Sequence, residues 1–419
     1  MPSYIALAIP AFFILIMVEI FVARRQGKAH YYRLNDSITD LACGIGQQVI
    51  HLLKKGLLLA GHFYLYENYA LFELPNWLMW TIAIVGIDFC YYWWHRLSHE
   101  VNFLWAIHVV HHHSEEYNLS VALRQAWFSG FSLWPFYAPL SILGVHPFVL
   151  LAADAISTLY QFWIHTRTIG KLGFFEWFFN TPAHHRVHHG RNVKYLDRNY
   201  GAISIIWDRI FGSFQEEEEE PVYGTVSPYT SWNPIWANFH YWVDLFKQAQ
   251  KAPYFVDKIK VWFMHPGWQP RGLEAKYDIE KIIQAERPVR FNTKIPSGLA
   301  IYIFVNFIFV ALATSGLMFF EKALSLPQVV LAVILILFTS LIWGAMFERK
   351  SWAFPVEIFR LILIAAISTT YFLFDQLPLL AISLIIVLAT GFLFWLLRYR
   401  NEFATNKTTI TKNEQVATV

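Results

Sequence analysis

Histidines at helical spacing are the residues of this chain most suited to chemistry. The sequence holds 17 histidines, and eight of them form three clusters in which the rings recur three or four positions apart. Positions at this spacing share one face of a helix, so each cluster directs its rings to one point. These residues are His95, His99, His108, His111, His112, His185, His188 and His189, with the isolated His165 as a ninth candidate. Neutral imidazole is the commonest metal-binding side chain, and so many rings exceed what one ion requires, so the sequence predicts a two-metal site.

A chance origin is the first alternative for these clusters. One pair of histidines four positions apart on an exposed helix is common by chance. Three clusters between residues 95 and 189 are different, because buried imidazoles need partners and these rings can find them only in a metal or in each other. The remaining isolated histidines are expected to be ordinary surface or interfacial residues. They are His30, His51, His62, His146, His240 and His265.

The ligand type narrows the choice of metal. All-nitrogen ligation suits iron, zinc or copper, whereas magnesium and calcium require oxygen ligands. Neither the zinc-protease motif His-Glu-x-x-His nor the Glu-x-x-His motif of soluble di-iron bundles occurs in the sequence. Cys43 and Cys90 are the two cysteines, and both lie in apolar stretches, so a thiolate site or a disulfide framework is not expected. The pattern favours a histidine-rich di-iron centre in a membrane.

The composition is that of a multi-span membrane protein. Of 419 residues, 56% are hydrophobic and only 15% are charged, and the mean hydropathy is +0.36. The net charge of +3 is too small to indicate a nucleic-acid partner, and the basic residues form no single stripe. We therefore expect an all-α, polytopic integral membrane protein.

Nine apolar segments are candidates for membrane spans. The first is followed by Arg24, Arg25 and Lys28, so it is predicted to be a retained span with its C-terminal end in the cytosol rather than a signal peptide. The segments lie near residues 3–22, 41–70, 77–94, 127–145, 147–165, 297–320, 327–347, 354–374 and 378–398. Lys54 and Lys55 interrupt the second segment. Prolines in the fourth and fifth segments can turn these two into a re-entrant pair.

Alternate threading of these segments predicts where the histidines lie. From an outside N-terminus, the basic loops at 349–350 and 398–400 face the cytosol. All nine histidines then meet at the cytosolic membrane surface as a catalytic cap. A lipid substrate can enter from the bilayer, while oxygen and reductant arrive from water. The expected membrane is the bacterial inner membrane or the endoplasmic reticulum.

The chain divides into three predicted regions. N-terminal spans occupy residues 1–76, the histidine-bearing catalytic region occupies 77–296, and a four-span module with a polar tail occupies 297–419. Within the catalytic region, Glu216–Glu220 is expected to be a solvated loop, because like charges in a run repel one another.

Stretches around the histidines resemble a known enzyme family. They read WHRLSHEVNFLWAIH, SEEYNLSVALRQ, YQFWIHT, NTPAHHRVHHGRN and NYGAISIIWDRIFGSF. The order of the three clusters resembles the fatty acid hydroxylase and sterol desaturase superfamily, whose members activate dioxygen at two metals. Over residues 85–215 the intervening phrases resemble, more narrowly, the alkylglycerol monooxygenases.

The resemblance implies a ligand set and a reaction. It implies that the eight clustered histidines, with His165 as a ninth, bind two iron ions. The implied reaction uses O2 to oxidise the carbon beside the ether oxygen of an alkylglycerol, which then yields a fatty aldehyde and a glycerol derivative. Tetrahydrobiopterin is the implied reductant, with an electron-donor protein as the alternative. A sterol, fatty acid or carotenoid hydroxylase or desaturase is the nearer alternative function. A membrane metal-binding or transport protein is the remote one, and its ligands should be distributed along the spans.

Several polar residues are predicted to support the ligands. Asp88 is a carboxylate inside an apolar segment, and its expected partner is a ligand imidazole or Arg96. Glu100 is a candidate for orienting an imidazole or contacting a pterin, with a solvated surface role as the alternative. The same network is expected to include Arg124, Asn118 and Asn180. His113 and His184 are next to predicted ligands in the sequence. Each is a candidate either to donate a hydrogen bond beside the metal ligands or to be an alternative ligand. The aromatic run Tyr91–Trp94 is expected to be a membrane-interface belt rather than a substrate cage.

Overall fold

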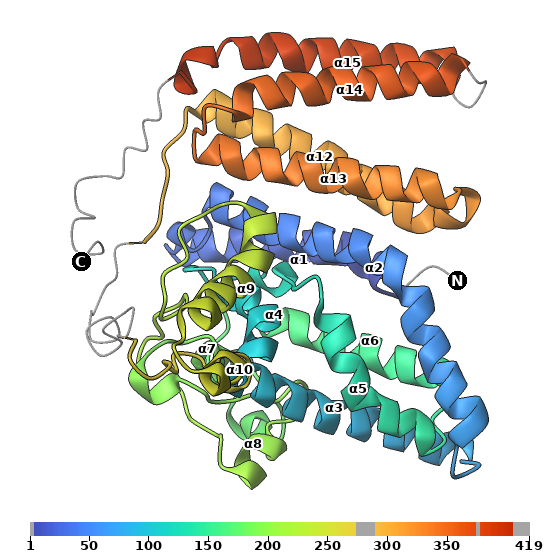
Figure 1. The fold of residues 1–419 in the computed structure, drawn as a ribbon, viewed down its shortest axis with the longest axis vertical. Helices are drawn as coiled ribbons and strands as arrows, with labels where there is room; N and C mark the ends of the chain where they lie inside the picture. The colour runs from blue at the N-terminus through green and yellow to red at the C-terminus, as the bar shows by residue number, and fades with distance from the viewer. Residues whose placement is uncertain (1–3, 274–289, 374–377, 405–419) are drawn as a thin grey trace.

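The computed structural model describes residues 4–273, 290–373 and 378–404, and in these ranges the protein is helical (Figure 1). The sole β-type contact among the described residues is an isolated bridge between Phe179 and Ser204. The all-α prediction is confirmed.

The helices of the predicted spans and the remaining α-helices occupy different parts of the molecule (Figure 1). The helices of the predicted spans run roughly along one direction. They are α1 (Tyr4–Arg25), α2 (Leu34–Tyr69), α3 (Asn76–Glu100), α5 (Ser129–Ile142), α6 (Pro147–Trp163), α12 (Ser297–Phe320), α13 (Leu326–Phe347), α14 (Ala353–Leu373) and α15 (Leu379–Leu397). The remaining described α-helices gather at one end of the lower bundle as a cap. They are α4 (Asn102–His112), α7 (Pro182–His188), α8 (Ile206–Phe211), α9 (Pro234–Lys251) and α10 (Phe255–Phe263).

Five of the nine predicted spans meet the requirements for crossing a membrane. Among the described residues, the helical segments long and apolar enough are Leu7–Arg25, Ser297–Ala323, Leu326–Phe347, Ala353–Thr370 and Leu379–Leu397. These segments and the family relationship reported below make the chain an integral membrane protein.

Three of the other four predicted segments differ from simple spans. Helices α5 and α6 have 14 and 17 residues. At 1.5 Å per residue these are about 21 and 26 Å long, shorter than the roughly 30 Å hydrocarbon core. Pro135 and Pro139 lie inside α5, and Pro147 begins α6. Helix α2 is longer than predicted, at 36 residues.

Helix α2 connects the catalytic region to the C-terminal helices. It packs against α5 and α9 on one side and against α12 and α13 on the other. Ile38 and Ala42 of α2 belong to the same buried cluster as Leu299, Ile303 and Phe347 of the C-terminal helices. The division at residues 76 and 296 stays a prediction, since α2 shares its packing with the other two regions.

Candidate metal centre

Three helices and one helix end present the candidate ligands. Helix α3 carries His95 and His99 in its last turns, and the chain reverses at Val101 so that α4 folds back along α3. Helix α4 carries three histidines at positions i, i+3 and i+4. Helix α7 begins with Pro182 at its first turn, which suits the fixed φ of proline, and bears the third cluster. His165 follows the end of α6.

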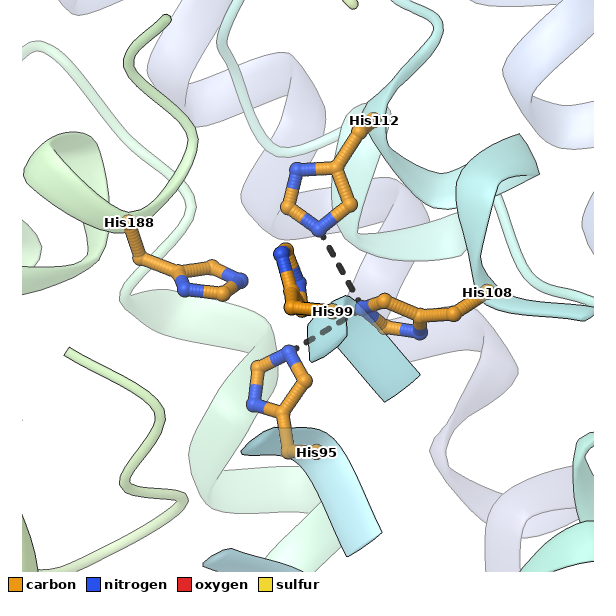
Figure 2. Close-up of side chains that lie close together, drawn as sticks. All are labelled: His95, His99, His108, His112 and His188. Carbon is orange, nitrogen blue, oxygen red and sulfur yellow. Dashed lines mark hydrogen bonds between the residues drawn. The ribbon is translucent and has the colours of Figure 1, made fainter. Parts of the chain in front are cut away.

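The nine histidines predicted to serve a two-metal site form two groups. In each group the candidate ligand atoms all lie within 4.8 Å of one another, and every member is buried. The five-residue group comprises His95, His99, His108, His112 and His188 (Figure 2). The four-residue group comprises His111, His165, His185 and His189. Figure 2 shows the rings of the first group, from α3, α4 and α7, pointing toward one another.

Distances between ring nitrogens suit ligands of a shared ion. His108 Nε2 lies 3.0 Å from His95 Nε2 and 3.2 Å from His112 Nε2. In the other group, His165 Nε2 lies 3.2 Å from His111 Nε2 and 3.0 Å from His185 Nε2. Two nitrogens bound about 2.1 Å from one ion at a right angle are about 3.0 Å apart. The geometry therefore fits nitrogen atoms that converge on a metal.

Backbone carbonyls fix the orientation of four rings. The Nδ1 atoms of His95 and His188 lie 2.8 and 3.0 Å from the carbonyl oxygens of Tyr200 and Arg198. The Nδ1 atoms of His111 and His165 lie 3.0 and 2.7 Å from the carbonyl oxygens of Arg124 and Gln161. A ring that donates from Nδ1 keeps Nε2 as an unprotonated ligand atom.

Unsatisfied nitrogen atoms show that these residues fit a metal. The Nε2 atoms of His99, His188 and His189 are buried with no hydrogen-bond partner. A buried polar atom without a partner is costly unless something else satisfies it. Burial, together with repulsion between rings, holds the pKa of His112 and His189 well below the usual value, and burial lowers the pKa of His188 to about 3. The rings are therefore neutral near pH 7, the form that binds metal.

Asp88 and Glu100 have partners other than the predicted ones. Asp88 accepts hydrogen bonds from the backbone N–H of Ile203 at 2.8 Å and from the indole N–H of Trp207 at 2.9 Å. The prediction of a histidine or Arg96 partner is wrong, because Asp88 lies two helical turns from His95 and faces the loop before α8. It anchors that loop to α3. Glu100 pairs with Arg96 at 2.9 Å, and its predicted imidazole or pterin contact stays a prediction.

Arg124 supports the second histidine group directly. Its guanidinium donates to Asp40 of α2 at 3.0 Å and to the carbonyl oxygen of Val110 at 2.7 Å, and all three groups are buried. Its own carbonyl oxygen is the one that holds His111. Asn180 donates to the carbonyl oxygen of Ala202, and Asn118 donates to that of Tyr31. These contacts fix the loops around the ligands.

His113 and His184 lie outside both groups. His113 stacks on Tyr229, with ring centroids 4.1 Å apart, and contacts the ring of His240. His184 contacts the ring of Phe214. Adjacent positions on a helix point in different directions, so neighbours of ligands need not be ligands.

An ion pair that the sequence does not predict lies beside the ligands. Arg186, between His185 and His188, forms a two-pronged salt bridge with Glu217, with both N–O distances 2.6 Å. It also donates to the carbonyl oxygens of Thr166 and Ile169. The solvated-loop prediction is thus wrong for Glu217, although Glu216 and Glu218 are exposed. The sequence feature that could have indicated this ion pair is the position of Arg186 between two predicted ligand histidines.

A cavity of about 260 Å³ reaches the histidines from within the helix bundle. His108, His111 and His165 lie in its wall, so it touches both groups. Tyr91 and Trp94 also line it, so the prediction that they form an interface belt is wrong for these two. They turn toward the cavity because the opposite face of α3, at Tyr92 and Trp93, packs against Phe211.

Comparisons with known proteins agree with this geometry. Residues 80–213, which include all nine histidines, match the family model described as fatty acid hydroxylase. The chain is 36% identical over 404 residues to alkylglycerol monooxygenase of Homo sapiens, covering 94% of this chain and 89% of that protein. It is 36% identical over 389 residues to that of Xenopus tropicalis, covering 91% and 85%. A partial match, 28% identical over 147 residues, is to ornithine lipid hydroxylase OlsE of Rhizobium tropici, covering 32% and 41%. No solved structure matches the chain.

Proposed function

The chain belongs to the alkylglycerol monooxygenase family, and on this premise we propose that it is a membrane monooxygenase that cleaves the ether bond of alkylglycerol lipids. The observation that carries the proposal is the pair of buried histidine groups, which contribute His108, His111 and His165 to the wall of a cavity lined largely by apolar residues. The family relationship extends over 94% of the chain, and it supports ether lipids as the substrate class.

The proposed ligand set assigns one iron ion to each histidine group. His95, His99, His108, His112 and His188 would hold one ion, and His111, His165, His185 and His189 would hold the other. The unsatisfied Nε2 atoms support this assignment, as does a donor set made only of nitrogen. When bound, the two ions supply the activation of dioxygen.

The proposed reaction inserts one oxygen atom into a C–H bond beside the ether oxygen. The second oxygen atom leaves as water, with two electrons and two protons from a reductant. The product is a hemiacetal, whose C–O bond to glycerol breaks as the hydroxyl proton moves to the glycerol oxygen. A fatty aldehyde and a free glycerol or glycerol derivative result. The residues of the chain bind the lipid, orient it and keep bulk water from the reacting carbon.

The electron source and the membrane side are further parts of the proposal. Tetrahydrobiopterin is proposed as reductant on the family relationship alone, and no residue is assigned to it. We propose that the cap faces the cytosol, of either a bacterial inner membrane or the endoplasmic reticulum. The basic residues Arg24 and Arg25 at the end of α1 and Arg349 after α13 support this orientation.

A topology experiment tests the orientation. In a background without Cys43 and Cys90, a cysteine at Glu218 in the cap should be protected from an impermeant thiol reagent in sealed right-side-out vesicles. A cysteine at Glu73, in the loop between α2 and α3, should react. Labelling at residue 218 without permeabilisation would contradict the proposed side.

An alternative substrate class is a different lipid. The partial matches to ornithine lipid hydroxylase OlsE and to a Delta(7)-sterol 5(6)-desaturase favour oxidation of another lipid, such as a sterol or an acyl chain, as the second candidate. A metal transport function is disfavoured, because the ligands gather at one end of the bundle and are not spread along its helices.

Substrate turnover tests the proposed function. Purified protein with iron, O2 and tetrahydrobiopterin should convert 1-O-hexadecylglycerol to hexadecanal. The ester 1-monopalmitoylglycerol should give no aldehyde, because its carbonyl carbon has no hydrogen to abstract. Hydroxylated sterol, acyl chain or carotenoid without any aldehyde would replace the ether-lipid assignment with the second candidate.

A further inference from the structure

The cavity has a polar wall that the metal chemistry does not use. Asp154 is the one charged residue of α6, a helix otherwise rich in apolar side chains, and it lines the cavity. Thr158 and Gln161, one and two turns further on, line it as well. An ionisable residue on an apolar helix that faces a cavity commonly marks a substrate pathway. Asp154 also faces the hydroxyl of Tyr137, and because a carboxylate accepts more than one hydrogen bond, it can accept a further one from a ligand in the cavity.

Helical spacing aligns this strip with the metal centre. Asp154, Thr158 and Gln161 stand at positions i, i+4 and i+7, so they share one face of α6. The strip is about 10 Å long at 1.5 Å per residue. The carbonyl oxygen of Gln161 holds His165 Nδ1, at 2.7 Å, so the strip ends at a member of the second histidine group.

Another part of the cavity wall is mainly apolar. Ile9, Phe12 and Phe13 of α1 line it with Phe307 and Ala311 of α12, and Thr314 and Ser315 are the polar residues of α12 that follow them. This sorting matches an amphiphile whose alkyl chain lies along α1 and α12 and whose polar head lies along α6.

The polar groups offer mostly acceptor oxygens. The amide nitrogen of Gln161 is engaged with the hydroxyl of Ser157, and that of Gln125 with the carbonyl oxygen of Ala122 at 2.7 Å. Each amide thus has an oxygen left for a hydroxyl donor. Asp154 adds carboxylate oxygens, and Lys54 donates to the carbonyl oxygen of Trp127 at 2.6 Å. Acceptors along α6 suit hydroxyl groups, and the carboxylate of Asp154 disfavours a phosphate group beside it, whereas the cationic Lys54 lines the cavity from α2.

We propose that Asp154, Gln161 and Gln125 form a subsite that accepts hydrogen bonds from the free hydroxyls of an unphosphorylated glycerol headgroup, and so sets the ether-adjacent carbon beside the histidine groups. The inference rests on the proposed function for the identity of the lipid. The inference adds which residues recognise the glycerol headgroup. It also gives a reason why an uncharged headgroup with two free hydroxyls should bind more tightly than a phosphorylated one.

A binding experiment without turnover tests the subsite. The iron-loaded full-length protein, without reductant, is mixed with radiolabelled 1-O-hexadecylglycerol. Displacement by unlabelled 1-O-hexadecylglycerol is compared with displacement by hexadecyl propyl ether, which lacks both hydroxyls. Asp154→Leu should weaken binding of the glycerol ether about 10- to 100-fold, the range for a hydrogen bond to a charged group, and should leave the hydroxyl-free ether unchanged.

Three comparisons make the result specific. Asp154→Asn keeps an acceptor oxygen and should retain most of the preference for hydroxyls. Gln161→Leu should reduce the preference, which gives a second test if Asp154→Leu fails to fold. Ile9→Ala, on the apolar wall, should weaken the binding of both ethers by the same factor. The 3-phosphate of the glycerol ether should bind the wild type more weakly than the neutral lipid.

Two outcomes would overturn the subsite. If Asp154→Leu lost binding affinity for both ethers by the same factor, the role of the carboxylate would be merely structural. An unchanged preference for hydroxyls in Asp154→Leu and Gln161→Leu would place the head elsewhere. Binding preference without aldehyde formation would contradict only the proposed reaction. Aldehyde formation by the wild type with unchanged preference in both variants would contradict only the subsite.

Discussion

The histidine-bearing region and the C-terminal helices bury different kinds of side chain. In the first, nine imidazoles converge in two groups, and four of their buried nitrogens have no hydrogen-bond partner within the described protein. In the second, α12–α15 bury apolar side chains, and their main polar cluster is the ion pair of Glu357 and Arg360. There Arg360 also donates to Asn306, so this cluster is satisfied within the protein.

This difference shows where the protein depends on a ligand. Polar groups left unsatisfied in the interior cost free energy unless a ligand completes them, whereas a satisfied cluster does not. The histidine region should therefore be stabilised by metal, and the C-terminal helices should not. Figure 1 shows α14 and α15 farthest from the cap, which makes independent behaviour measurable.

The largest expected effect is the loss of a ligand. Alanine at any of the nine histidines should abolish turnover, because ligands of a shared centre act as a unit. His265→Ala is the control, since His265 belongs to neither group, and it should keep near-normal activity. Aldehyde formation and metal content are measured together. Normal activity in His99→Ala or His189→Ala would remove that residue from the centre.

Removing the metal should separate the two regions. Chelation should abolish activity reversibly and should speed amide hydrogen exchange in α3, α4 and α7, because metal that binds only the folded state stabilises it. Exchange in α13 and α15 should not change. Faster exchange spread equally over all these helices would mean that the regions are not energetically distinct.

The ion pair beside the ligands should have an intermediate effect. Glu217→Ala leaves Arg186 without its carboxylate, at 8% side-chain exposure, between two ligand histidines. Loss of a group that supports metal ligands typically costs about 10- to 100-fold in metal affinity or activity, and we expect a loss in that range. Glu216→Ala, in the same glutamate run but exposed, is the matched control and should behave as wild type. Equal behaviour of the two variants would contradict the positioning role.

The C-terminal ion pair should affect stability without affecting the metal. Glu357→Ala leaves the buried Arg360 unpaired, and breaking a buried pair costs about 3–5 kcal/mol. The thermal midpoint should fall, while metal content and activity below that midpoint should stay within about twofold of wild type. Loss of metal in this variant would couple the two regions and weaken the comparison.

Local spacing explains why the histidine clusters were predictable. His95 and His99, or His108 and His112, share a helix face whatever the rest of the fold does. The division into two groups was not predictable from spacing, because the adjacent residues His111 and His112 belong to different groups. Asp88 was not predictable in this way, because its partners at Ile203 and Trp207 depend on a distant loop.

The extent of the long helices and the roles of their polar residues were harder to predict. Hydropathy identified α12–α15 because these segments are long and predominantly apolar. It could not give the length of α2, whose first turns bury Asp36 and Asp40 against the cap, nor the cavity role of Asp154. Both depend on which polar groups face each other across different helices, and a single segment does not contain that information.

Metal stoichiometry tests the central claim, two metal sites built from two histidine groups, most directly. Elemental analysis of the active protein should find about two iron ions per chain, one for each group. His95→Ala and His185→Ala, one from each group, should each lower the count and together should bring it close to zero. One ion per chain in fully active protein, or a single four-coordinate zinc, would contradict the two-site centre.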